Sequence, residues 1–227
     1  MTGFTDAGAA VSGTVDFMRV HADLQPLAIF DNDVLLDYRA RRPIVTFDAD
    51  HLTDYVPPRL ELCLARDALG QQFLLLAGYE PDFAWEAFAD AVLDLADDYA
   101  VSSMTWVHSI GMPVPHTRPL AVTVSGNRRD LIESFSGWRP HTQVPATAGH
   151  LLEYRFAEDE QSVAGFVLLV PHYLADTDNP EATIATIEWI ARANELAFLF
   201  DDLNRDLDEY RGKVAEQVAA NEELQRL

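Results

Sequence analysis

The order of hydrophobic and polar positions predicts a chain in which strands and helices alternate. Short runs dense in apolar and β-branched residues are typical of buried strands. A turn over Asp67 to Gly70 separates two such runs, which indicates that these two strands pair antiparallel. We expect strands within residues 26–33, 41–50, 59–66, 71–78, 101–110, 120–127 and 162–170.

Apolar residues at helical spacing predict helices between these strands. The clearest one lies within residues 80–100, where Pro81 suits the first helical turn. Asn179 followed by Pro180 is typical of an N-cap and the first position of another helix. Further helices are expected near residues 6–18 and 144–158. The clearest helix has one apolar face, formed by Trp85, Phe88, Val92, Leu95 and Tyr99.

This alternation favours an α/β domain with a mostly parallel central sheet and helices on both of its faces. We assign this domain to residues 1–200. Residues 201–227 differ because they are strongly charged and continuously helical in pattern, so we interpret them as a C-terminal helical arm that faces a partner. The apolar positions of that arm are near coiled-coil spacing: Leu203, Leu207, Tyr210, Val214 and Leu224.

The composition narrows the classes of function. The 227 residues include 37 acidic and 16 basic side chains, a formal net charge of -21, which disfavours general binding to nucleic acid or anionic membranes. The acidity serves solubility, and a basic protein partner is the alternative. Cys63 is the single cysteine, so an intrachain disulfide is excluded. We expect a soluble cytoplasmic protein, because no signal peptide opens the chain and no apolar run could span a bilayer.

Several polar residues follow the predicted strands directly. Asn32 follows the apolar run "LAIF", Glu80 follows the strand within residues 71–78, and His172 and Tyr173 follow the one within residues 162–170. If the strands are parallel, these groups converge on one edge of the sheet, where α/β proteins bind ligands. The alternative is structural: Asp6 and Glu80 would cap helices, and the histidines would hydrogen-bond the backbone.

The segment "GMPVPHTRPL" is a stiff loop between two predicted strands. Pro115 and Pro119 restrict the backbone around His116, Thr117 and Arg118. We expect intrachain hydrogen bonds to acidic or carbonyl groups to hold His116 and Arg118. Replacing Arg118 by alanine would then leave a buried carboxylate unpaired.

Motifs for catalysis or for cofactor binding do not occur in the sequence. It contains no GxSxG, no P-loop, no HExxH and no GxGxxG. The histidines are too scattered to indicate zinc, and Cys63 does not join them at a metal-binding spacing. We therefore assign no catalytic residue, no metal and no cofactor.

Six motifs together resemble a known family. "GFTDAG", "FDNDVLLDYRARRP", "LLLAGYEPDFAWEAF", "VPHTRP", "LLEYR" and "VPHYLADTDNPEA" occur in this order, and the chain is similar over nearly its whole length to the actinobacterial branch of the proteasome assembly chaperone 2-like family. The resemblance implies a three-layer α/β fold similar to nucleoside phosphorylases and hydrolases, and self-association as trimers. The eukaryotic namesake helps to assemble the proteasome core particle. The family's motif residues correspond to Asp6, Asn32, Arg39, Arg41, Glu80, Trp85, His116, Thr117, Arg118, His172 and Tyr173.

The chain departs from the family pattern at both ends. Family members have an apolar strand just before "GFTDAG" and continue the helical arm beyond "NEELQRL". We therefore expect a central strand ahead of Gly3, and we expect this chain to be poorly stable without that strand. In addition, "VPATAG" stands where "VPGSA" is usual.

These observations favour a non-catalytic assembly or interaction protein that self-associates and is linked to proteasome assembly. The alternative is a small-molecule-binding protein, or an enzyme of the nucleosidase or hydrolase type, that uses a polar pocket at the strand ends. We hypothesise that Glu80, His116, Arg118 and His172 line that pocket, which would hold a small anion or a partner's carboxylate. The wider set of candidate binding residues adds Asp6, Asn32, Trp85, Thr117 and Tyr173.

Overall fold

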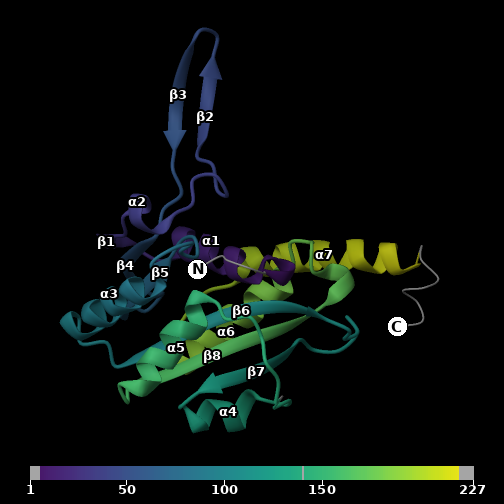
Figure 1. Cartoon of the computed structure of the whole chain (residues 1–227). Coiled ribbons are helices and arrows are strands. Elements are labelled where there is room, and N and C mark those ends of the chain that lie inside the picture. Colours follow the sequence, from purple (N-terminus) through teal and green to yellow (C-terminus); the bar gives the residue numbers. More distant parts are fainter. Residues whose placement is uncertain (1–5, 140, 220–227) are drawn as a thin grey trace.

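A computed structural model of the chain describes residues 6–139 and 141–219, and within them the strands form three separate sheets (Figure 1). The first part of the predicted opening turn and the arm residue Leu224 lie outside these described residues. The chain has a mixed α/β fold, as the sequence predicts.

The first sheet is antiparallel, with the order β1-β4-β5. The predicted turn joins β4 to β5, and the Asp67 carboxylate fixes it by accepting hydrogen bonds from the amides of Leu69 and Gln71 at 2.9 and 2.8 Å. The connection of five residues, 67–71, leaves no room for a crossover helix, so these neighbours must run in opposite directions. The strands are β1 (Gln25–Ile29), β4 (Glu61–Arg66) and β5 (Gln72–Ala77).

The second sheet has the order β6-β8-β7 and is mixed. β6 pairs parallel with β8 over ten residue pairs, from Ser103 opposite Ser162 to Met112 opposite Pro171. β7 pairs antiparallel with β8. β8 is the central strand and is buried almost throughout, as a strand between two neighbours and two helix layers must be. The strands are β6 (Ser103–Met112), β7 (Ala121–Gly126) and β8 (Ser162–Pro171).

The expectation of a mostly parallel sheet is therefore wrong. Among the described strands, β6 and β8 form the only parallel pair. An apolar run indicates that a strand is buried but says nothing about the direction of its neighbour. That direction depends on the connection between them, and only a connection of a dozen or more residues returns a strand parallel.

Helices cover both faces of the second sheet. On β8, Phe166 packs with Ala193 and Trp189 of α6, whereas Val163 clusters with Phe156 of α5. α1 packs against α6, and α3 packs against α5 and the first sheet. These helices are α1 (Ala10–His21), α3 (Trp85–Asp98), α5 (Ala148–Glu158) and α6 (Pro180–Asn194).

The last helix, α7 (Asp201–Ala219), begins at the residue where the C-terminal helical arm was predicted to begin. It lies along α6, where Arg211 pairs with Glu181 at 3.0 Å. Leu207 and Val214 are its buried residues. Shorter helices complete the described chain: η1 (Ala7–Ala9), α2 (Asn32–Leu35), α4 (Arg129–Phe135) and η2 (His172–Leu174).

A two-stranded hairpin, β2 (Ile44–Asp48) with β3 (His51–Val56), extends away from both other sheets (Figure 1). Ten of its eleven strand residues are exposed, and Thr53 is half-buried. The sequence pattern indicated only the first of these strands. An alternation of apolar and polar residues could not indicate β3, because neither face of the hairpin is buried against the rest of the chain.

Candidate functional site

Asn32, at the start of α2, joins two segments that flank the first sheet. Its side-chain amide donates to the Pro58 carbonyl at 2.7 Å, and its Oδ1 accepts from the Tyr79 hydroxyl at 2.6 Å. Tyr79 is 5% exposed, and burial raises the pKa of its hydroxyl. The Asn32 side chain therefore holds the base of the hairpin to the end of β5.

Glu80 acts on the start of a helix. Its Oε1 accepts a hydrogen bond from the Ala148 amide at 2.7 Å, and its side chain is almost fully buried. A carboxylate at this position satisfies an otherwise unpaired helical N–H and favours the positive end of the helix dipole. Thr147 caps the same helix through a reciprocal capping box with His150.

Arg41 and Trp85 brace the backbone around Glu80. The Arg41 guanidinium donates to the Glu80 carbonyl and pairs with Asp82 at 3.2 Å. The Trp85 indole N–H donates to the Pro81 carbonyl at 2.6 Å, at the beginning of α3. Arg39 is exposed. Apart from Arg39, these side chains fix the loop between β5 and α3.

Asp6 organises the entry to α1. Its carboxylate accepts from the amides of Val11 and Ser12 at 2.7 and 2.9 Å, from the Ser12 hydroxyl at 2.6 Å, and from the Ser109 hydroxyl at 3.2 Å. Asp6 also forms an isolated parallel bridge with Ser109 of β6. The chain thus enters α1 from a position beside β6.

The stiff loop "GMPVPHTRPL" contacts η2. The Tyr173 hydroxyl lies 2.8 Å from the His116 amide, which donates to it, and 2.7 Å from His116 Nδ1. His116 is therefore held by intrachain hydrogen bonds, but its partner is a hydroxyl and not the acidic or carbonyl group that we expect from the sequence. For Arg118 the prediction is wrong: its side chain is exposed and has no ion pair within the described residues.

The structure separates the residues that we hypothesised to line one pocket. His116, Thr117 and Arg118 line a cavity of about 420 Å³ beside Tyr210 and Arg211 of α7. Glu80 lines a different cavity of about 470 Å³. The separation arises because β5 and β6 belong to different sheets, so their ends do not meet at one edge.

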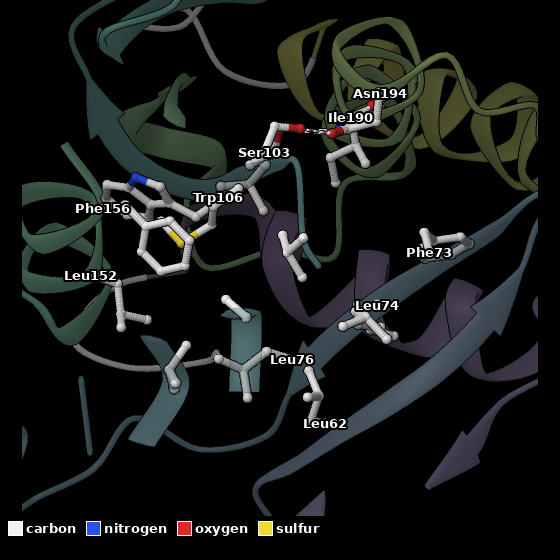
Figure 2. Close-up of a pocket in the computed structure, with 18 of the residues that line it drawn as sticks. Leu62, Phe73, Leu74, Leu76, Ser103, Trp106, Leu152, Phe156, Ile190 and Asn194 are labelled. Carbon is white, nitrogen blue, oxygen red and sulfur yellow. Dashed lines mark hydrogen bonds between the residues drawn. The ribbon is translucent and has the colours of Figure 1, made fainter. Parts of the chain in front are cut away.

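The larger cavity lies between the first and the second sheet (Figure 2). Consecutive residues of β5, Phe73 to Leu76, line it together with consecutive residues of β6, Ser103 to His108. Successive side chains of a strand point to opposite faces, so a cavity lined by every residue in turn lies along the strand edge. Figure 2 shows Leu74 and Leu76 on one side of this space and Trp106 and Phe156 on the other.

Apart from Glu80, the polar residues that line this cavity are not among the candidate binding residues. His108 lines it, and its ring centroid lies 6.2 Å from that of His150. Burial lowers the pKa of both imidazoles, and the positive charge that His150 can carry lowers the pKa of His108 further. Ser103 and Asn194 contribute hydroxyl and amide groups 3.4 Å apart. In the sequence, Ser103 and His108 are polar residues within a predicted strand, and His150 and Asn194 are polar residues within predicted helices. Both patterns are common, so neither indicates a site.

Two buried side chains, Cys63 and Ser109, could in principle act as nucleophiles, but neither is activated for that role. Burial raises the pKa of the Cys63 thiol, which keeps it protonated and weakly reactive. Ser109 is fully buried and donates to Asp6. Within the described ranges, the His, Cys, Asp and Glu side chains form no group of three placed to hold a metal ion. No described helix is long and apolar enough to cross a membrane.

Comparison with known proteins identifies relatives over the whole chain. The model of the PAC2 family matches residues 1–218. A protein of unknown function from Mycobacterium tuberculosis is 41% identical, with all of this chain and 77% of that one aligned and a TM-score of 0.93. A protein of unknown function from Corynebacterium glutamicum is 33% identical, with 100% and 84% coverage and a TM-score of 0.95.

More distant structures share the fold. A proteasome-assembly chaperone homologue from Mycobacterium tuberculosis is 21% identical, with 100% of this chain and 96% of that chain covered and a TM-score of 0.90. No curated protein matches the chain.

Proposed function

The chain belongs to the PAC2 family, and on that premise we propose that it is a non-catalytic assembly or interaction protein whose partners are other protein chains. Proteasome subunits are the first candidates, because one structure with the same fold is named a proteasome-assembly chaperone homologue. The proposal includes self-association as a trimer, a cytoplasmic location, a fold related to nucleoside phosphorylases without their chemistry, and a C-terminal helical arm, residues 201–227, that faces a partner.

The β2–β3 hairpin is the observation that carries this proposal. Phe47 is 70% exposed and Leu52 is 64% exposed, and four more apolar side chains of the hairpin are also exposed. An isolated two-stranded hairpin is at best marginally stable in water, and a concentrated exposed apolar surface marks an interaction site. Burial of these side chains by a partner would stabilise both the hairpin and the complex. The four others are Ile44, Val45, Tyr55 and Val56.

The test is an assembly assay with separately purified proteasome core subunits from the same organism. We expect the wild-type chain to bind a subunit and to raise the rate at which core particles appear on native gels. The variant Phe47→Ser/Leu52→Ser should weaken that binding roughly tenfold or more, because the few buried apolar anchors of an interface dominate its affinity.

Leu69→Ser provides the matched control for this assay. Leu69 is 84% exposed at the turn between β4 and β5, away from the hairpin. Its loss should leave subunit binding unchanged. A wild-type chain that binds no subunit and does not change the assembly rate would contradict proteasome subunits as partners.

A second candidate function is recognition of a small anion or a carboxylate at the loop of His116. The supporting observation is that His116, Thr117 and Arg118 line one cavity, in which the other arginine, Arg211, is already paired with Glu181 at 3.0 Å. Arg118 presents an exposed guanidinium there, and a guanidinium can bind a carboxylate or phosphate with two hydrogen bonds. Titration with phosphate, nucleosides or short C-terminal peptides should shift the His116 imidazole resonances if this site binds them.

A further inference from the structure

The loop that follows β6 holds three consecutive polar side chains in one place. Its backbone forms a β-turn, in which the Arg118 amide donates to the Pro115 carbonyl at 3.4 Å. The rings of Pro115 and Pro119 restrict the backbone on either side. His116, Thr117 and Arg118 all line the cavity of about 420 Å³ beside α7. The backbone that carries these side chains is thus fixed before a ligand arrives, which lowers the entropy lost on binding.

Tyr173 decides which nitrogen of the His116 ring can donate. The Tyr173 hydroxyl accepts from the His116 amide at 2.8 Å, so its own hydrogen is left for His116 Nδ1, 2.7 Å away. Nδ1 is then the acceptor, and the uncharged ring carries its hydrogen on Nε2. His116 lines the cavity and Tyr173 does not. Nε2, on the far side of the ring from Tyr173, is therefore the donor that a ligand in the cavity can use.

An apolar wall belongs to the same cavity. Pro171 and Leu174 come from the end of β8 and from η2, and Val214 and Ala215 come from α7. Ligand sites in proteins commonly combine such apolar lining with a few polar groups that fix the orientation of the ligand. This lining therefore fits a ligand that carries an anionic group and an apolar group close together.

The charges around the cavity favour a ligand with one negative charge. Arg211 and Glu181 both line it, but they pair with each other at 3.0 Å. Arg118 makes no ion pair within the described residues, so it supplies the positive charge that remains for a ligand. A phosphate ester carries a charge of about -1.5 to -2 at pH 7, whereas a carboxylate carries one negative charge. Because the formal net charge of the chain is -21, it repels the phosphate ester more strongly.

From these features we propose that the cavity binds the C-terminal end of a peptide chain whose last side chain is apolar. The terminal carboxylate accepts from the Arg118 guanidinium, which can form two parallel hydrogen bonds with it, and from His116 Nε2. The last side chain packs against the apolar wall between η2 and α7. The inference rests on the second candidate function, recognition of a carboxylate at this loop, and names the class of ligand.

The arrangement of groups distinguishes a chain end from an internal acidic residue. In a C-terminal residue the carboxylate and the side chain branch from the same carbon atom, so both fit into one small cavity. An internal aspartate or glutamate carries its carboxylate at the end of the side chain, and no second side chain accompanies it. The nearness of a guanidinium to an apolar wall is therefore used fully only by a chain end.

Isothermal titration with matched peptides tests the proposal. The first probe is an uncharged, acetylated hexapeptide that ends in leucine with a free carboxylate. The second is the same peptide with a C-terminal amide, and the third ends in glycine with a free carboxylate. We expect the first probe to bind roughly tenfold or more tightly than either of the others, because each of them lacks one of the two recognised groups. Inorganic phosphate is titrated in parallel.

Two variants locate the binding at this cavity. Arg118→Gln should weaken binding of the free acid roughly tenfold or more and remove the difference between acid and amide, which a purely structural role of Arg118 leaves unchanged. Ala215→Glu keeps every donor and adds a negative charge on the exposed side of α7, so it should also weaken the free acid. The matched control is Arg42→Gln, which removes the same charge at an exposed arginine just before β2 and should leave binding unchanged. Thermal melting establishes that each variant is folded.

Four results would overturn the proposal: no binding of the free-acid peptide that ends in leucine, equal affinity for acid and amide, equal affinity for peptides ending in leucine and in glycine, or unchanged binding by folded Arg118→Gln. If phosphate binds through Arg118 and the peptides do not, recognition of a small anion at this loop stands and only this inference falls. If neither peptides nor phosphate bind, the second candidate function falls too, and the proposed assembly function is unaffected.

Discussion

At the scale of single residues, several side chains selected as binding candidates fix the backbone. The Asp6 carboxylate holds the start of α1, Glu80 holds the start of α5, and Asn32 ties Pro58 to Tyr79. The physical reason is that a buried polar group must find hydrogen-bond partners, and the N–H groups at a helix start are the donors without a partner inside the helix.

The contact between Tyr173 and His116 gives the first prediction. Tyr173→Phe removes the hydroxyl that the His116 amide and imidazole contact. We expect it to lower the free energy of unfolding by about 1 kcal/mol, the usual net contribution of such a hydrogen bond. Denaturant unfolding followed by circular dichroism measures the change.

Arg118→Ala is the matched comparison in the same loop. Its guanidinium is exposed and makes no ion pair within the described residues, so we expect a change of no more than about 0.5 kcal/mol. A large loss of stability in Arg118→Ala, with little effect of Tyr173→Phe, would reverse the assignment of the bracing contact.

The second prediction concerns the pH dependence that His108 introduces. Burial lowers the pKa of its imidazole in the folded chain, and His150 lowers it further. Between the ordinary imidazole pKa of about 6.5 and the lowered folded value, the unfolded chain binds more protons. The free energy of unfolding is therefore highest above the ordinary imidazole pKa and decreases as the pH falls below it, because the unfolded chain takes up a proton that the buried imidazole resists.

His108→Gln should reduce this loss, which is measured as the difference in unfolding free energy between pH 7.5 and pH 5.5. The control is His51→Gln, at the exposed tip of the hairpin, where the side chain is 60% exposed. That substitution changes an exposed side chain and should alter the unfolding free energy at pH 7.5 by no more than about 0.5 kcal/mol. An equal change in unfolding free energy between the two pH values in wild type and in His108→Gln would show that burial of His108 does not cause the loss of stability.

At the scale of elements, the two larger sheets each end in a strand with one unpaired edge. Among the described strands, β5 pairs only with β4 and β6 only with β8, and the 470 Å³ cavity separates them. Asp6 is already in parallel register with Ser109 of β6. A strand placed in this space could pair with β6 on one side and with β5 on the other, as the expected central strand requires.

This geometry gives the third prediction. Adding an extended apolar segment of about six residues ahead of residue 1 should raise the free energy of unfolding by several kcal/mol, because it pairs ladder groups of both strands and fills an apolar space. Thermal unfolding measures the difference between the extended and the unextended chain.

A Gly-Ser segment of equal length is the control, since it is flexible and has no apolar side chains to bury. A chain whose melting temperature is the same with either addition would show that the space between β5 and β6 does not accept a strand.

At the scale of the whole molecule, charge governs which partners can approach. The formal net charge of -21 creates a negative surface potential that repels nucleic acid. The fourth prediction is that the chain shifts neither double-stranded nor single-stranded DNA in a gel assay at physiological salt. The variant Asp48→Lys/Asp50→Lys should behave in the same way, because it leaves the chain strongly acidic. Binding that weakens steeply with added salt would contradict this prediction.

The sequence by itself determined where most elements lie. Periodicity located β6, β8 and α3, the pair Asn179–Pro180 marked the start of α6, and Asp67 marked the turn between β4 and β5. These features depend on local rules: the spacing of apolar side chains, the geometry of proline, and the ability of a short polar side chain to accept from nearby amides.

The tertiary structure decided the direction of the strands, the separation of Glu80 from His116, the exposure of Arg118, and the hairpin that extends into solvent. Each depends on contacts between residues far apart in sequence. A polar residue after a strand has the same appearance in the sequence whether its neighbour runs parallel or antiparallel. Similarly, the sequence does not indicate whether an apolar side chain is buried within its own chain or exposed for a partner.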